Sequence, residues 1–133
     1  MAVDLGLSRT GLAVCDELEM LASPLGTVAE TDLDKLLDTV VETAQRERVK
    51  ALVVGHPKNM DGTRGESAQR AEAFAEALRE RTALPVALWD ERLTTVSAIG
   101  FLNETNVRGK KRKAIVDTVS ATIILQEYLD SRR

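Results

Sequence analysis

The sequence has 133 residues and a formal net charge of −3, with 44% hydrophobic and 29% charged residues, which is ordinary for a globular domain with a buried core. No apolar run approaches the ~20 residues that span a bilayer, and no signal-peptide pattern is present at the start. The single cysteine, Cys15, excludes an internal disulfide and a cysteine-based metal cluster. We therefore expect one domain, a cytoplasmic location and no membrane partner.

The positive charge is concentrated in one segment. Residues 108–113 read RGKKRK and hold five of the 18 lysines and arginines, so the rest of the chain is acidic. An acidic protein with one basic segment can still bind a polyanion at that segment. The alternative interpretation of this segment is a solvated loop.

The first predicted elements are three strands. Residues 1–6 and 9–15 form two of them, and the short link between them indicates a hairpin. Residues 19–28 form the third strand, in which Pro24 favours an edge position or a bulge because proline cannot donate to a sheet ladder.

Helices and strands alternate after residue 30. A helix begins at Thr31 or Asp32, either of which can cap it, and the apolar spacing carries it to about residues 46–48. An entirely apolar strand follows over 51–54, as in a strand that is buried on both faces.

The second half continues this alternation. The predicted elements are a loop over 55–66, a helix over 66–81, a strand over 86–89, a short helix from Thr94 or Thr95 to Leu102, a polar stretch over 103–112 and a final helix over 113–130. The order β-β-β-α-β-α-β-α predicts an α/β fold with a mixed five-stranded sheet. In it, an antiparallel meander is extended by parallel strands, and helices cover both faces.

Acidic residues fall where the predicted strands end. Asp4 lies in the first strand, Asp90 and Glu91 end the last strand, and Asp117 lies one turn into the final helix among apolar residues. Sites collect at adjacent strand ends of α/β sheets, so these acids can converge. Converging carboxylates repel one another unless a cation joins them, and an all-oxygen site favours one or two Mg²⁺ or Mn²⁺ ions. Such ions promote phosphodiester hydrolysis.

Each of these acids also has a purely structural interpretation. Asp4 can be a strand-end acid that meets a turn, Asp117 can be a helix-surface acid, and one of Asp90 and Glu91 can be a charge at a helix N-terminus. Gly6 has no Cβ and therefore lets a backbone segment or a phosphate come close to Asp4. The three positions together with the strand order are more specific than any one of them.

The chain resembles the YqgF family, also called RuvX, in four blocks that run in the family's order: AVDLGLSRTGLAVCDELEMLASPLGTV, VVGHPKNMDGTRG, LWDERLTT and KRKAIVDTVSATIILQEYL. The blocks cover nearly the whole chain, so the resemblance implies a single RNase H-like domain over residues 1–133. It also implies a metal-dependent nuclease with Asp4, Glu91 and Asp117 as metal ligands. Asp90 remains the rival of Glu91 in that role.

The resemblance also suggests the substrate class. Family members are linked to 5′-end maturation of pre-16S ribosomal RNA and are also discussed as resolvases of Holliday junctions. The sequence does not choose between structured RNA and branched DNA. A two-fold symmetric junction would suit a homodimer, whereas an RNA 5′-end nuclease can be a monomer.

Candidate substrate contacts surround the predicted acidic site. Arg92 follows the acids directly, where it can orient a phosphate or pair with a neighbouring acid. Arg9 lies in the predicted hairpin turn, and Arg64 lies in the loop after a strand end. The basic segment adds Arg108, Lys110, Lys111, Arg112 and Lys113 as a phosphate clamp.

His56, the only histidine, departs from the family pattern, in which a hydrophobic residue often stands between the glycine and the proline of this block. One interpretation is a loop histidine without a special role. The other is a phosphate contact or a proton donor.

Two other functions remain open at this point. One is a nucleic-acid-binding factor for ribosome maturation whose acids do not catalyse. The other is an ATPase of the actin and sugar-kinase type, because DLGLSRTG resembles the phosphate-binding hairpin of those proteins. The length of 133 residues cannot supply the second domain that encloses their nucleotide, which disfavours the ATPase.

Overall fold

The computed structural model describes residues 1–58, 61–90 and 109–132, with side chains throughout these ranges except over 109–118. The elements in chain order are β1 (Ala2–Asp4), β2 (Arg9–Cys15), β3 (Ala22–Ala29), α1 (Leu33–Arg46), β4 (Leu52–His56), α2 (Glu66–Thr82), β5 (Val86–Asp90) and α4 (Gly109–Ser131). The short helix predicted to end at Leu102 lies outside the described residues. No helix within the described ranges has the length and apolar character needed to cross a bilayer.

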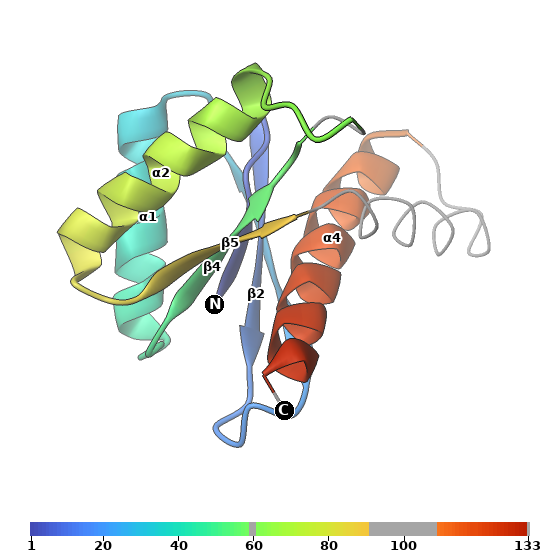
Figure 1. Cartoon of the computed structure of the whole chain (residues 1–133). Coiled ribbons are helices and arrows are strands. Elements are labelled where there is room, and N and C mark those ends of the chain that lie inside the picture. The colour runs from blue at the N-terminus through green and yellow to red at the C-terminus, as the bar shows by residue number, and fades with distance from the viewer. Residues whose placement is uncertain (59–60, 91–108, 133) are drawn as a thin grey trace.

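The strands form one five-stranded sheet in the order β3-β2-β1-β4-β5 (Figure 1). β2 pairs antiparallel with both β1 and β3, whereas β4 pairs parallel with both β1 and β5. The predicted meander with a parallel extension is therefore confirmed. The first strand of the chain becomes the central strand of the sheet, and Ala2 and Val3 are accordingly fully buried.

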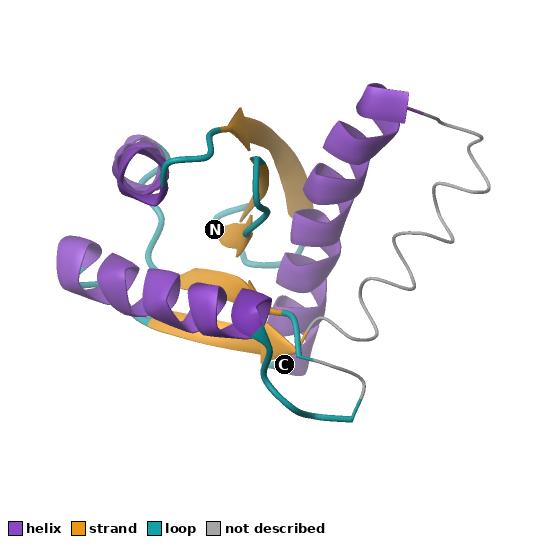
Figure 2. Cartoon of the chain, turned by 90° about the horizontal axis from the view of Figure 1, so that it is seen from above, coloured by secondary structure: helices purple, strands orange, loops and turns teal. Residues whose placement is uncertain are grey.

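Helices cover both faces of the sheet, as predicted (Figures 1 and 2). On one face, called the α2 face, Val3 and Val54 of the sheet pack with Val40 of α1 and Leu78 of α2. On the other, called the α4 face, Ala2 and Val53 of the sheet join apolar residues of α4 that include Ala121, Ile124, Leu125 and Leu129. Alternating side chains of each central strand thus enter two separate cores.

The predicted consequences of Pro24 are both confirmed. β3 is an edge strand, and its register with β2 shifts between Leu12, which pairs with Gly26, and Ala13, which pairs with Pro24. Leu25, between these two pairs, is the extra residue of a β-bulge. The bulge accommodates the proline, which has no backbone N–H to donate.

The N-cap of α1 is Asp32 rather than Thr31. The Asp32 carboxylate accepts hydrogen bonds from the backbone N–H groups of Asp34 and Lys35. These bonds satisfy two of the backbone donors that a helix N-terminus leaves without an intrahelical partner.

The final helix is longer than predicted. α4 begins at Gly109, so residues 109–112 are helical and not part of a polar loop. Lysine and arginine are good helix formers, and the charge of this segment concealed that propensity. Among the described side chains of α4, the buried ones are Ser120, Ala121, Ile124, Leu125 and Leu129. Val119, Thr122, Ile123 and Tyr128 are half-buried.

Candidate active site

Asp4 is the last residue of the central strand and is half-buried. A sharp turn follows it, and Gly6 is required there because a Cβ on this residue would lie 2.0 Å from the carbonyl oxygen of Arg9. The close approach predicted at Gly6 is therefore one of backbone to backbone. Arg9 is the first residue of β2, as the predicted strand over 9–15 has it, and it pairs there with Ala29 rather than lying in the turn.

The register of the parallel strands places Asp90 relative to Asp4. Val3, Val54 and Leu88 are in register and belong to the α2 face, whereas Ala2 and Val53 belong to the α4 face. Since side chains alternate along a strand, Asp4 shares the α4 face with Ala2, and Asp90 shares the α2 face with Leu88. Asp4 and Asp90 therefore end β1 and β5 at the same edge of the sheet, on opposite faces of it.

Residue 117 lies on the sheet-facing stripe of α4. It precedes the buried residues Ala121, Ile124 and Leu125 by four, seven and eight positions, the spacing of one helical face. The helix brings this stripe to the α4 face of the sheet, the face to which strand alternation assigns Asp4.

The direction of α4 follows from Gln126, whose side chain accepts from the backbone N–H of Ala22 at 2.8 Å and donates to the carbonyl of Met20 at 3.1 Å. Ala22 pairs with Cys15, the last residue of β2, which lies at the amino end of β1. Residue 117 lies about 13 Å earlier along the helix axis, so it is displaced toward the carboxyl end of β1. Asp4 and position 117 are thus brought to the same face and toward the same edge.

The basic segment enters α4 rather than a loop. Positions 110–113 lie in the first turns of the helix, where the backbone N–H groups carry partial positive charge. Position 113 precedes position 117 by four residues, so both lie on one side of the helix. Arg108, Glu91 and Arg92 lie outside the described residues, and the roles predicted for them stay predictions.

The interpretation of His56 as a loop residue is wrong. It is the last residue of β4, where it is 8% exposed and in register with Asp90. Its Nε2 lies 2.5 Å from Oε2 of Glu72 on α2. Arg64 donates from Nη1 to the other oxygen, Oε1, of the same carboxylate at 2.8 Å. The hydrogen bond from His56, with the nearby Arg64 cation, holds the pKa of Glu72 below its usual range.

Glu72 and Arg70 are not among the residues that the sequence pattern singled out. Glu72 directly follows Ala71 and lies four residues after Ala68, and both alanines are fully buried. This spacing puts Glu72 at the margin of the buried helical face, which was the available signal. Arg70 donates from Nη2 to the carbonyl of Gly6 at 3.4 Å and so joins α2 to the turn after Asp4.

The described side chains contain no group of three His, Cys, Asp or Glu residues that could hold a metal ion. The predicted ligand set has only Asp4 among these side chains, since Glu91 and the side chain of Asp117 lie outside them. The placement of Asp4 and position 117 on one face is compatible with an oxygen-ligand site, and the complete ligand set stays a prediction.

Comparison with known proteins identifies the family. The family model RuvX, described as Holliday junction resolvase, matches residues 1–131. A protein of Protochlamydia amoebophila (strain UWE25) is 43% identical over 139 residues, with 99% of this chain and 93% of the relative covered. A protein of Geobacillus kaustophilus (strain HTA426) is 44% identical over 135 residues, with 100% and 98% covered. Both carry the name "Putative pre-16S rRNA nuclease".

A solved structure gives the fold. The structure titled "T. thermophilus RuvC in complex with Holliday junction substrate" matches with a TM-score of 0.58 and 15% identity, over 98% of this chain and 92% of that chain. At this identity the likeness concerns the fold alone, and it confirms the RNase H-like architecture that the family resemblance implied. The match over nearly the full length and the identity to curated relatives lead to one conclusion: the chain belongs to the RuvX family.

Proposed function

We propose that this protein is a divalent-metal-dependent endonuclease that hydrolyses phosphodiester bonds in structured nucleic acid. The proposal is supported by the position of Asp4 at the end of the central strand and of residue 117 in the helix that packs on the α4 face, in a chain of the RuvX family. A half-buried carboxylate at the end of the central strand, in a sheet covered by a helix that starts with basic residues, is suited to a cation between protein and phosphate.

The metal ligands would be Asp4, Glu91 and Asp117, with Mg²⁺ or Mn²⁺ as the ion. Their carboxylate oxygens match the preference of hard divalent cations. We assign the second carboxylate to Glu91 because Asp90 lies on the α2 face, opposite to Asp4. When bound, such an ion lowers the pKa of water and stabilises charge on a phosphoryl oxygen.

The basic positions at the start of α4 would hold the substrate backbone. Lys110, Lys111, Arg112 and Lys113 follow one another within the first turns of the helix, shortly before position 117 of the proposed metal site. Contacts of this kind position a nucleic acid without reading its bases, and they weaken as salt rises. Arg9, Arg64, Arg92 and Arg108 are the other proposed phosphate contacts.

The 5′ end of pre-16S ribosomal RNA is our first candidate substrate, because the relatives that are 43% and 44% identical to this chain are each named "Putative pre-16S rRNA nuclease". A branched DNA junction is the second candidate, supported by the description of the family model. A processing factor that binds without cleaving is the competing function. A cytoplasmic location and a homodimer stay predictions.

A cleavage assay with matched substrates tests this proposal. Purified protein is offered a pre-16S 5′-leader RNA and a four-way DNA junction, each with Mg²⁺, with Mn²⁺ and with EDTA. We expect cleavage of the RNA that requires the ion, with binding that persists in EDTA and weakens with salt. Cleavage of the junction alone would shift the substrate to DNA, and salt-dependent binding without any ion-dependent product would favour the binding factor.

A further inference from the structure

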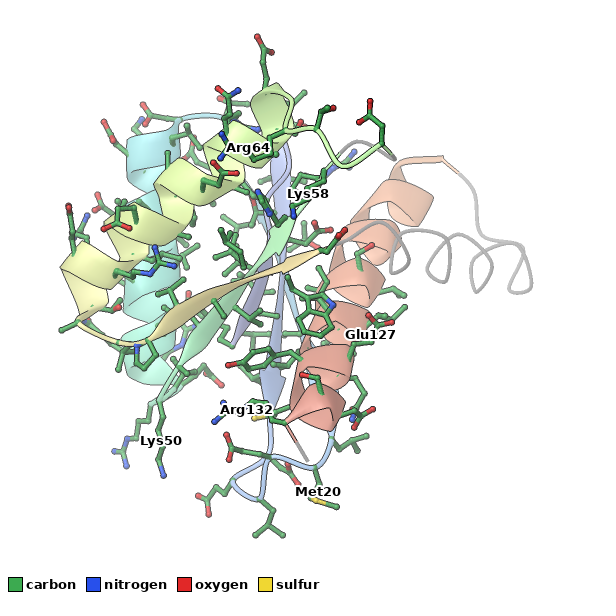
Figure 3. The ribbon with its side chains drawn as sticks, viewed as in Figure 1. Met20, Lys50, Lys58, Arg64, Glu127 and Arg132 are labelled. Carbon is green, nitrogen blue, oxygen red and sulfur yellow. The ribbon has the colours of Figure 1, made fainter. Side chains whose placement is uncertain are left out.

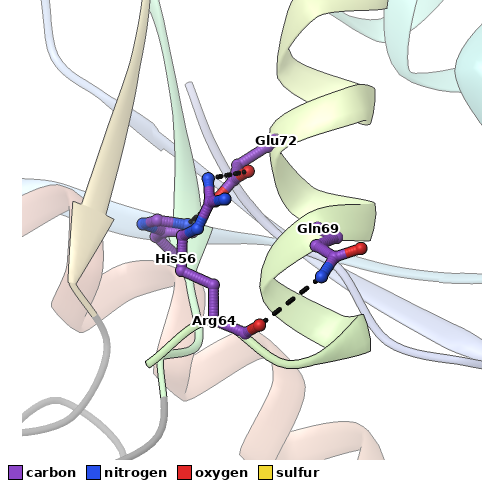
Figure 4. Close-up of polar contacts among 4 residues, drawn as sticks. All are labelled: His56, Arg64, Gln69 and Glu72. Atoms are coloured by element: carbon purple, nitrogen blue, oxygen red, sulfur yellow. Dashed lines mark hydrogen bonds and ion pairs between the residues drawn. The ribbon is translucent and has the colours of Figure 1, made fainter. Parts of the chain in front are cut away.

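A network of three side chains lies on the α2 face beside the end of β5. Glu72 projects from α2 and uses one carboxylate oxygen for His56 at the end of β4 and the other for Arg64 in the following loop (Figure 4). The side chain of His56 is 10% exposed, whereas that of Arg64 is 57% exposed. The network therefore connects a buried strand end to an exposed cation.

The buried part of this network is fixed by the sheet. His56 is in register with Asp90 on β5, so its backbone position is set by ladder hydrogen bonds next to the predicted acidic block. An ionised carboxylate only accepts hydrogen bonds, so His56 donates to Glu72 through Nε2. This bond orients the Glu72 carboxylate and leaves its second oxygen for Arg64.

The exposed part is held at two points. The backbone carbonyl oxygen of Arg64 accepts from Nε2 of Gln69 at 3.5 Å, and Nη1 of Arg64 donates to Glu72 (Figure 4). A guanidinium has five N–H donors, and within the described residues Arg64 commits only Nη1 to another side chain. Figure 3 shows Arg64 and Lys58 in the part of the molecule where β4 ends. The remaining donors suit a phosphate oxygen, which they can bind at the same time as Glu72.

We propose that Arg64 contacts a substrate phosphate on the α2 side of the site, and that Glu72 and His56 are positioning residues that hold its guanidinium in place. The inference rests on the proposed function, since it assigns a second group of phosphate contacts to the same nucleic-acid substrate. Arg64 is bonded to α2, which covers one face of the sheet, whereas the basic segment starts α4, which covers the other. A substrate that reaches both spans the sheet edge where Asp4 lies.

The charge of Glu72 makes the proposal testable. Removing a partly exposed negative charge near a polyanion normally tightens binding, because repulsion falls. A positioning role predicts the opposite, since Arg64 then loses the partner that orients it. Glu72→Gln should therefore weaken binding by about 3- to 10-fold, and Arg64→Gln by about tenfold with a salt slope that is smaller by about one.

The experiment measures binding without catalysis, so that it stands apart from the cleavage test. Fluorescence anisotropy is recorded in EDTA with the pre-16S leader RNA for the wild type, Arg64→Gln, Glu72→Gln and the double variant. Glu76→Gln is the matched control, because Glu76 forms an ion pair with Arg79 on the same helix away from this network. We expect the double variant to bind no more weakly than Arg64→Gln alone, since Glu72 acts through Arg64.

His56 supplies two further measurements. A glutamine amide can donate from nearly the position of Nε2, so His56→Gln should retain affinity and His56→Leu should lose it, with both variants folded by circular dichroism. As the only histidine, His56 also gives a single set of imidazole NMR signals. These should shift on addition of RNA to the wild type and stay unchanged in Arg64→Gln.

The outcomes separate the two proposals. Tighter or unchanged binding by Glu72→Gln, or additive losses in the double variant, would overturn the positioning role even if cleavage is observed. Loss of cleavage without these binding effects would concern the metal site alone. Weaker binding by Arg64→Gln, Glu72→Gln and His56→Leu with no cleavage by the wild type would retain Arg64 as a phosphate contact of a non-catalytic protein.

Discussion

Asp4 and Asp90 end two strands at the same edge of one sheet, yet they lie on opposite faces of it. The in-register triplet Val3, Val54 and Leu88 defines the α2 face, and each acid lies one or two residues beyond its member of that triplet. One residue of offset reverses the face in a pleated strand. Asp4 and Asp90 therefore end strands at the same edge of the sheet, but their side chains are on opposite faces.

This difference predicts unequal effects of two matched substitutions. Asp4→Asn should reduce cleavage by about 10²-fold or more, since a metal ligand contributes several kcal/mol to the transition state. Asp90→Asn should reduce it by less than about tenfold, because Asp90 is on the face away from Asp4. Both rates are measured under single-turnover conditions with unchanged thermal stability as the control. Equal losses of cleavage rate in the two variants would indicate that Asp90 is also a metal ligand.

The turn after Asp4 should not tolerate a side chain. A Cβ at position 6 would lie 2.0 Å from the carbonyl oxygen of Arg9, which is backbone and cannot rotate away. Gly6→Ala should lower the free energy of unfolding by about 2 kcal/mol or more, measured by urea denaturation. Ser8→Ala is the control, because Ser8 is exposed in the same turn. A loss below about 0.5 kcal/mol would show that the turn can rearrange.

Close packing of α4 should be needed for activity. Ala121 is fully buried against the sheet and lies one turn after position 117. Ala121→Leu adds volume at this contact and should cost about 1–3 kcal/mol of stability. It should also lower cleavage in protein that is still folded, because α4 is displaced from the face where Asp4 lies. Ile123→Leu, at a half-buried position, should change neither quantity appreciably.

The lowered pKa of Glu72 predicts how stability depends on pH. A group whose pKa is lower in the folded state stabilises the fold above its unfolded pKa, and this contribution is lost as pH falls through the folded pKa. The hydrogen bond from His56, then Arg64, lowers the pKa of Glu72 below 4.5. Wild type should therefore be more stable than Glu72→Gln at about pH 6, and the difference should shrink as pH falls below about 4.5.

Urea denaturation of both proteins between about pH 3 and pH 7 measures this difference. Glu76→Gln serves again as the control for loss of one exposed carboxylate on α2. A difference between wild type and Glu72→Gln that grows as the solution becomes more acidic would contradict this prediction.

The order of strands and helices along the chain, the two-faced burial and the fold class could be predicted from the sequence, because they follow from local apolar spacing and from the turn and cap residues at Pro24 and Asp32. The candidate acids could also be named, since a carboxylate at a strand end or in an apolar helical stretch stands out without coordinates. Long-range placement could not be predicted in the same way. Which face each acid occupies depends on inter-strand register, a property of pairing between segments that are far apart in the chain.

The His56 network shows the same division. From the sequence, His56 is a loop histidine without a special role, or a phosphate contact or proton donor, and Arg64 is a candidate substrate contact with no link to His56. Only the tertiary structure extends β4 through residue 56 and lays α2 beside it, so that one carboxylate of α2 meets both side chains. Residue types and local spacing determine which groups are available, whereas sheet register and helix packing decide which of them share a site.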